Sequence, residues 1–169
     1  MTSAPRTAAT GARPLAIRSV DHTGITVSSL QESLKFWTDV LGFEHLYTWQ
    51  FENSPFVENL VGVAGASVDL AMVKGYGHQI ELLEYHSPAD RTILKPRSCD
   101  VGSVHVAMYV DDLDAVLKRL EEANWTAVGP AQRIEGGERD GWKLVYVRDP
   151  DGVTLEFLQP ASDWEPSGA

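Results

Sequence analysis

The spacing of apolar side chains predicts one helix between extended segments in the first half of the chain. Residues 20–27 alternate between polar and apolar and are rich in β-branched side chains, which is typical of a strand. After two serines that are candidate caps, apolar side chains recur at helical spacing from Leu30 to Leu41, until Gly42 ends the helix. Extended apolar runs follow the helix.

The second half of the chain repeats this order of elements. Residues 103–110 have the pattern of a strand, and apolar side chains from Leu113 to Leu120 recur at helical spacing beside acids that favour a helix N-terminus. In both halves a glycine-containing turn signal, at 74–77 and at 149–152, separates the last two extended runs. Each half therefore predicts a β-α-β-β-β module.

The two halves also align residue by residue. A shift of 83 residues places His22 on His105 in the first strand, and a shift of 75 residues places Glu81 on Glu156 in the last strand. Because an internal repeat organises a whole fold, we expect an α+β protein with one domain at 17–160. Its expected parts are a disordered tail at 1–16, a first module at 17–86, a linker at 87–100, a second module at 101–160 and a C-terminal extension at 161–169.

The duplicated polar residues indicate a metal site. If a pseudo-twofold axis relates the modules, equivalent strand positions converge on it, and the four side chains face one shared cavity. Two imidazoles and two carboxylates suit a divalent ion, and the two negative ligands balance its charge. We therefore expect one ion, with room for water or substrate, to be bound by His22, Glu81, His105 and Glu156.

Other polar residues are weaker candidates for metal ligands or catalytic groups than the four residues of the repeat. Glu84 lies three residues beyond Glu81, so the two side chains point to opposite faces of one strand, and the repeat aligns Glu84 with Gln159. Glu81 is therefore the predicted ligand. Cys99, in the linker, has no paired base and is not expected to be a nucleophile. Three histidines lack a counterpart in the repeat and are interpreted as surface or supporting residues: His45, His78 and His86.

The amino-acid composition excludes some classes of binding partner. The 169 residues include 14 Lys and Arg against 24 Asp and Glu, and the net charge of -10 argues against nucleic acid or an anionic membrane as the partner. No apolar run is long enough to cross a membrane. A single cysteine excludes an intramolecular disulfide and fits a reducing compartment. We expect a small-molecule substrate and a location in the cytoplasm.

The motifs of both modules resemble a known family. The strands DHTGITV and GSVHVAMYV, the segment FWTDVLGF and the final DPDGVTLEFLQP are similar to the vicinal oxygen chelate superfamily, also called the glyoxalase, bleomycin resistance and dioxygenase family. The resemblance covers residues 17–160. It implies a cupped, incompletely closed barrel with a metal at its base, and it implies a homodimer. The family's four ligand positions match the four residues of the repeat.

A complete ligand set resembles the isomerising branch of this family, which includes glyoxalase I and the sugar or acyl-CoA epimerases. In that branch a substrate with two adjacent oxygens chelates the metal, and a carboxylate moves a carbon-bound proton. The resemblance implies Glu156, or Glu81 opposite it, as the catalytic base. The resemblance does not decide which metal is bound, and the candidates are zinc, nickel, cobalt, manganese and iron.

Three functions remain open. The first is an epimerase or isomerase acting on a small hydroxy-ketone, such as the cyclitol 2-epi-5-epi-valiolone or a keto-sugar, or on an acyl-CoA. The others are a lyase similar to glyoxalase I and a metal-free binding or self-resistance protein. Cationic candidates for binding a charged substrate are Arg91, Lys95, Arg97, Arg133 and Arg139. Aromatic candidates for a pocket or the core are Trp49, Phe51, Phe56, Tyr109 and Trp142.

Overall fold

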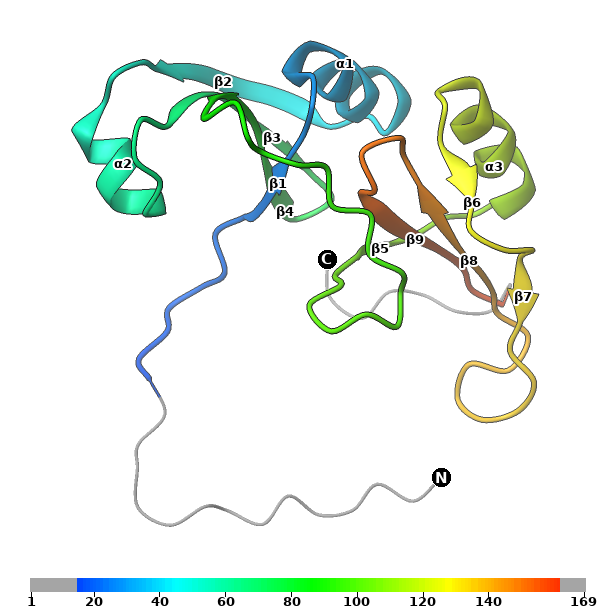
Figure 1. Cartoon of the computed structure of the whole chain (residues 1–169). Coiled ribbons are helices and arrows are strands. Elements are labelled where there is room, and N and C mark those ends of the chain that lie inside the picture. The colour runs from blue at the N-terminus through cyan, green and yellow to red at the C-terminus, as the bar shows by residue number, and fades with distance from the viewer. Residues whose placement is uncertain (1–14, 162–169) are drawn as a thin grey trace.

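The computed structural model describes residues 15–161, so the expected tail and C-terminal extension fall almost entirely outside the described residues. The chain forms two sheets, one in each half of the molecule, and their principal helices lie near each other at one end (Figure 1). Within residues 15–161, no helix has the length and apolar character that a membrane span requires.

The first module contains four strands and three helical elements before the linker. Its elements are β1 (Thr23–Thr26), α1 (Leu30–Lys35), the π-helical turn η1 (Phe36–Val40), β2 (Glu44–Phe51), α2 (Pro55–Val61), β3 (Ser67–Gly75) and β4 (His78–Ser87). The strand order is β1-β4-β3-β2, with β1 parallel to β4 and the other pairs antiparallel. We call this sheet A.

The second module repeats this arrangement with a broken second strand. Its elements are β5 (Val106–Tyr109), α3 (Leu113–Glu122), β6 (Thr126–Ala127), β7 (Gln132–Arg133), β8 (Lys143–Arg148) and β9 (Thr154–Gln159). The strand order is β5-β9-β8-β6, and β7 also pairs with β8. We call this sheet B. The two sheets do not close into a barrel, so the predicted α+β fold of two modules and an open barrel is confirmed.

Three local features differ from the predicted elements. The helix predicted up to Leu41 is α-helical only to Lys35 and then continues as the π-helical turn. The short helix α2, begun by Ser54 and Pro55, interrupts what was expected to be extended chain. The strand after α3 is split into β6 and β7 because the intervening segment contains Pro130, which cannot donate a ladder hydrogen bond.

The helix starts follow from local capping. Ser29 accepts a hydrogen bond from the Glu32 backbone in α1, and Asp112 does the same for Ala115 in α3. Each helix also receives a side chain from the last strand of its own module. Glu84 accepts from the Leu30 backbone N–H at 2.7 Å, and its counterpart Gln159 accepts from the Leu113 N–H at 2.9 Å. The repeat thus extends to the way each helix is fixed on its sheet.

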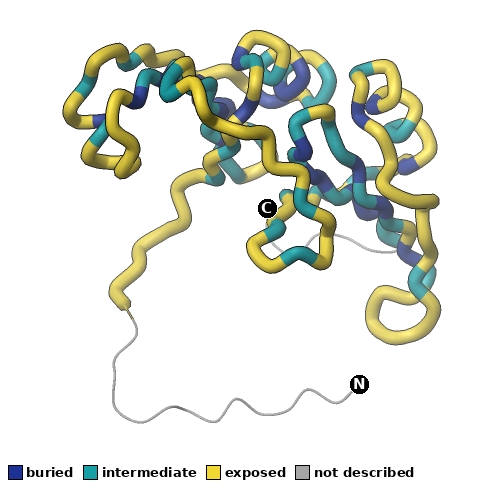
Figure 2. The backbone as a smooth tube through the Cα atoms, viewed as in Figure 1, coloured by how far each residue is buried: buried dark blue, intermediate teal, exposed yellow. Residues whose placement is uncertain are grey.

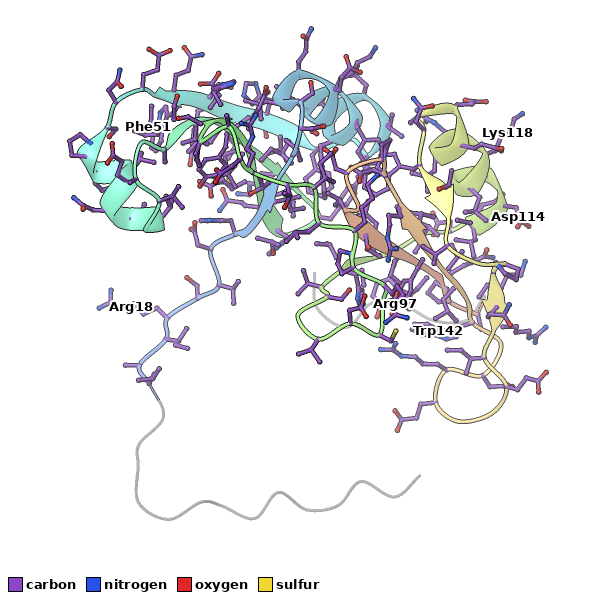
Figure 3. The ribbon with its side chains drawn as sticks, in the orientation of Figure 1. Arg18, Phe51, Arg97, Asp114, Lys118 and Trp142 are labelled. Carbon is purple, nitrogen blue, oxygen red and sulfur yellow. The ribbon has the colours of Figure 1, made fainter. Side chains whose placement is uncertain are left out.

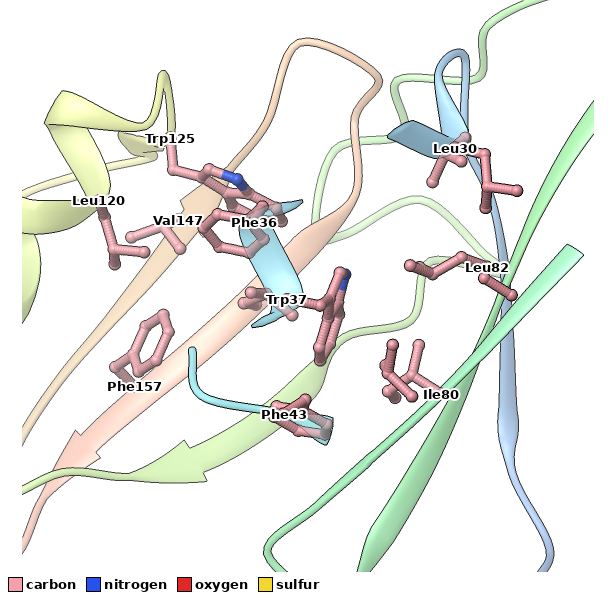
Figure 4. Close-up of a cluster of buried hydrophobic side chains, with 14 of the residues drawn as sticks. Leu30, Phe36, Trp37, Phe43, Ile80, Leu82, Leu120, Trp125, Val147 and Phe157 are labelled. Carbon is pink, nitrogen blue, oxygen red and sulfur yellow. The ribbon is translucent and has the colours of Figure 1, made fainter. Parts of the chain in front are cut away.

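One hydrophobic core runs through both modules (Figure 4). It joins side chains of α1 and η1 to those of α3 and to one face of each sheet. At its centre Phe36 stacks on Trp125, with ring centroids 4.5 Å apart and planes at 17°. In Figure 2 the buried residues gather between the helices and the sheets, whereas the linker after β4 is exposed over most of its length. We call the face of each sheet that points away from these helices its outer face.

Candidate functional site

The first candidate pair lies at the start of β1. His22 Nε2 is 3.3 Å from Glu81 Oε2 on the neighbouring strand β4. The parallel register places Gly24 opposite Glu81, so the histidine precedes the paired position by two residues. Ile80 and Leu82 point into the core, so Glu81 points to the outer face of sheet A.

The second pair reproduces this geometry in sheet B. His105 Nε2 is 3.1 Å from Glu156 Oε2, and Ala107 is the residue opposite Glu156 in the parallel register of β5 and β9. The glutamate side chain is largely buried, whereas the histidine is 39% exposed. Each module therefore presents one imidazole nitrogen and one carboxylate oxygen at a solvent-accessible edge.

The spacing within each pair fits two ligands of one metal ion. Two ligand atoms at ~2.1 Å from an ion lie roughly 3.0 Å apart at a right angle and roughly 3.4 Å apart at the tetrahedral angle. The observed separations of 3.3 Å and 3.1 Å fall within that interval. Nitrogen and carboxylate donors suit zinc and the other divalent transition metals. Each module therefore supplies two of the four protein ligands that the expected metal site requires.

The described residues do not show the expected convergence of the two pairs on one shared cavity. Across residues 15–161 no group of three or more His, Cys, Asp or Glu side chains is arranged to hold a metal ion. The hydrophobic core between the two sheets explains this arrangement of the pairs. Because the helix-covered faces of both sheets are joined through Phe36 and Trp125, each outer face points away from that contact.

Two neighbours of the pairs were not identified from the sequence. Asp21 Oδ2 lies 2.7 Å from His22 Nδ1, and since a carboxylate only accepts, Nδ1 donates and Nε2 is directed to the ligand position. In sheet B, Tyr146 lies opposite Glu156, and its ring is 4.8 Å from that of His105. The turn signal at 149–152 does not give this register, because a turn of those four residues pairs Arg148 with Val153, whereas the structure pairs Arg148 with Thr154.

Both glutamates affect a nearby phenol. Burial raises the pKa of Tyr146, and the negative charge of Glu156 raises it further. Burial likewise raises the pKa of Tyr85, with a smaller contribution from Glu81. Both side chains are therefore neutral hydrogen-bond donors near neutral pH.

The remaining polar candidates have other contacts. Glu84 caps α1, as described above, and Cys99 is exposed in the linker. The histidines without a repeat counterpart contact side chains outside the two pairs: His45 contacts Thr48, His78 contacts Thr23, and His86 contacts Asp69.

Three of the cationic candidates are also engaged within the chain. Arg97 makes a bidentate contact with Asp100, Arg91 donates to backbone carbonyls of the linker region, and the Arg139 guanidinium lies over the Trp142 ring at 4.9 Å. Of these three contacts, the one between Arg97 and Asp100 balances a positive charge with a negative one.

Comparison with known proteins identifies the family. The model of the glyoxalase/bleomycin resistance protein/dioxygenase superfamily matches residues 19–157, which include both candidate pairs. The chain belongs to this superfamily. Enzymes of the glyoxalase superfamily usually bind a divalent metal, in agreement with the donor set of the two pairs.

Relatives within the glyoxalase superfamily include enzymes of two kinds. The chain is 33% identical over 144 residues to a 2-epi-5-epi-valiolone epimerase of Actinomyces, covering 83% of this chain and 78% of that protein. It is 27% identical over 140 residues to a probable lactoylglutathione lyase of Vibrio parahaemolyticus, covering 82% and 88%. A glyoxalase family protein of Bacillus cereus has the same fold, with a TM-score of 0.76, 21% identity and coverage of 90% of this chain and all of that one. The similarity to enzymes supports an enzymatic role.

Proposed function

We propose that the protein is a divalent-metal-dependent epimerase or isomerase that transfers a proton next to a chelated oxygen of a small hydroxy-ketone. The observation that carries this proposal is the repeated pair of a histidine nitrogen and a glutamate oxygen, at 3.3 Å in one module and 3.1 Å in the other. The 33% identity to a 2-epi-5-epi-valiolone epimerase supports the reaction class.

The proposed ligands are His22, Glu81, His105 and Glu156. When bound, the ion supplies a Lewis acid that stabilises the negative charge formed on substrate oxygen as the proton leaves carbon. The two carboxylates balance the charge of the ion, and Asp21 orients one imidazole through its Nδ1 hydrogen. Zinc, nickel, cobalt, manganese and iron all suit this mixed nitrogen and oxygen shell.

The proposed site is shared by two copies of the chain. Since the core holds the outer faces of the two sheets apart, the pair on sheet A of one copy meets the pair on sheet B of the other. A twofold axis then produces two equivalent sites, as expected of an isologous dimer.

Glu156 is the proposed base, and Glu81 is the proposed second proton carrier. Epimerisation removes a proton from one face of a carbon and returns one to the other face, so it needs two carriers around one planar intermediate. The two glutamates come from different sheets and approach a shared substrate from different sides. Tyr146, neutral and opposite Glu156, is positioned to donate a hydrogen bond on that side.

Solvent deuterium incorporation tests the proton transfer. With excess metal present, the protein is incubated in D₂O with 2-epi-5-epi-valiolone, and exchange is compared for wild type, Glu156→Gln and Glu81→Gln. We expect exchange to fall by about 10²-fold or more in Glu156→Gln. Glu84→Gln is the matched control, because a glutamine amide oxygen still caps the helix, as Gln159 does in the second module. Unchanged exchange in Glu156→Gln would remove this residue from the role of base.

A further inference from the structure

Three aromatic side chains form a ladder along the edge strand of sheet A. Tyr47, Trp49 and Phe51 occupy alternate positions of β2, so they share one face of the sheet. Tyr47 and Trp49 are stacked, with ring centroids 4.7 Å apart and planes at 26°. Trp49 and Phe51 meet edge to face at 6.3 Å and 89°. We call these three residues the aromatic ladder.

The strand register places the aromatic ladder beside the candidate metal pair. Tyr47 is opposite Met72, and Met72 is opposite Glu81, so the three residues form one row across the sheet. Two strand spacings separate the backbone of Tyr47 from that of Glu81 by roughly 10 Å. Trp49 follows one row further along β2. A compact ring held at Glu81 therefore reaches the aromatic ladder within the length of the intervening side chains.

Two residues of the aromatic ladder are exposed above a buried apolar floor, and the third, Phe51, is half-buried against the cluster of Val57 and Val68. Trp49 is 54% exposed and Tyr47 is 37% exposed, whereas Met72 and Leu70 beside them are buried. The surface along the same stretch of the edge strand, from Thr48 to Phe51, is shallow and open to solvent. Figure 3 shows that Phe51 and Trp142 lie at opposite ends of the molecule, so the aromatic ladder is separate from the aromatic residues of sheet B.

Charge on sheet A favours a neutral ligand. Its four strands contain a single basic residue other than histidine, Lys74, and that residue is opposite Glu44 in the ladder of β2 and β3. On the face that carries the aromatic ladder the further acid of these strands is Glu81, because Glu84 and its strand partner Asp69 point to the opposite, helix-covered face. A phosphate-rich or carboxylate-rich substrate tail would find no uncompensated basic side chain on this face of the four strands. A polyhydroxylated ring needs no such side chain, and its C–H face is apolar enough to pack on an indole.

We propose that the aromatic ladder is the wall that binds the substrate's ring, and that the substrate is a compact, uncharged, polyhydroxylated cyclohexanone. This inference rests on the proposed function, since it requires the substrate oxygens to be held at Glu81. The C–H face of the ring packs on Trp49, with Met72 and Leu70 as the floor. An extended thioester would instead place its long chain away from this wall.

Binding measurements on the metal-loaded protein test whether the aromatic ladder binds the substrate's ring. Isothermal titration calorimetry with 2-epi-5-epi-valiolone compares wild type with Trp49→Ala, Trp49→Phe and the control Phe56→Ala, whose ring is exposed on α2 outside the aromatic ladder. We expect Trp49→Ala to weaken binding about tenfold and Trp49→Phe to weaken it less, because a smaller ring keeps part of the apolar contact. Phe56→Ala should bind as wild type does.

Metal content and molecular mass are measured on the same samples. If metal content and molecular mass are unchanged in Trp49→Ala, the loss of affinity comes from the lost contact between the indole and the substrate's ring. Wild-type affinity in Trp49→Ala, or dissociation of the dimer in that variant, would overturn the inference. Wild-type turnover of a glutathione hemithioacetal without cyclitol binding would also overturn it, while leaving metal-dependent proton transfer intact. Absence of a bound metal in wild type would instead contradict the proposed function.

Discussion

Phe36 of the first module stacks on Trp125 of the second, with 4.5 Å between ring centroids and 17° between planes. Both rings are nearly inaccessible to solvent and belong to the core that spans the two halves. This contact fixes how the modules are oriented, so it also determines that the two histidine and glutamate pairs lie on separate outer faces.

Removing this stack should destabilise the whole domain. Phe36→Ala is expected to lower the free energy of unfolding by about 3–4 kcal/mol, because it deletes a buried ring and leaves a cavity. Phe56→Ala removes the same atoms from a side chain that is 66% exposed, and it should change stability by less than about 1 kcal/mol. Chemical denaturation of both variants measures the difference. Equal stability of the two variants would contradict the account of the core.

The hairpin between β8 and β9 provides a second contact between modules. Asp151 accepts hydrogen bonds at 2.7 Å from both the backbone N–H and the hydroxyl of Ser28, just before α1. Asp151→Ala should cost about 1–2 kcal/mol of unfolding free energy. In a double-mutant cycle with Ser28→Ala, we expect a coupling of about 0.5–1 kcal/mol. Strictly additive losses would mean that the hydroxyl contact does not contribute.

Asp149, in the same hairpin, should make stability depend on pH. Burial raises the pKa of this carboxyl to about 6, against the lowering effect of the hydrogen bond that it accepts from the Val153 N–H. The folded protein therefore binds more protons than the unfolded chain between about pH 4 and pH 6. This group's contribution to the unfolding free energy falls as pH rises through that window.

Asp149→Asn should remove this dependence while keeping an oxygen that accepts from Val153. Because the side chain is partly exposed, solvent screening reduces the expected gain to about 1–2 kcal/mol above pH 6. Near pH 4 the variant and wild type should converge. Denaturation curves across this pH range measure the difference, and a constant difference at all pH values would exclude Asp149 as its cause.

Much of the fold follows from local patterns in the sequence. The helix start at Asp112 is a local capping signal, and the turn before His78 contains Tyr76 and Gly77, both with positive φ, as a two-residue hairpin requires. The repeat itself distinguishes Glu81 from Glu84, because Glu84 aligns with Gln159 and both cap a helix. Such features depend on residues that are close in sequence or related by the duplication.

The relative orientation of the modules could not be predicted in this way. It depends on Phe36 meeting Trp125, a contact between residues far apart in sequence, and no periodic pattern specifies it. The expected shared cavity assumed that duplicated positions converge within one chain. The position of the aromatic ladder was also inaccessible, since a register shift between His45 and Tyr47 decides which β2 residues share a face with Glu81.

The central claim is that one metal ion is held by His22 and Glu81 of one chain and by His105 and Glu156 of another. Two differently tagged variants, His22→Ala and His105→Ala, are coexpressed, and the mixed dimer is purified through both tags. Each variant alone should lack both sites. In the mixed dimer, one site carries both substitutions and the other site carries neither. The mixed dimer should therefore bind about one ion per dimer and recover about half of the wild-type deuterium exchange. A mixed dimer with no more metal or exchange than the single variants would contradict the shared site.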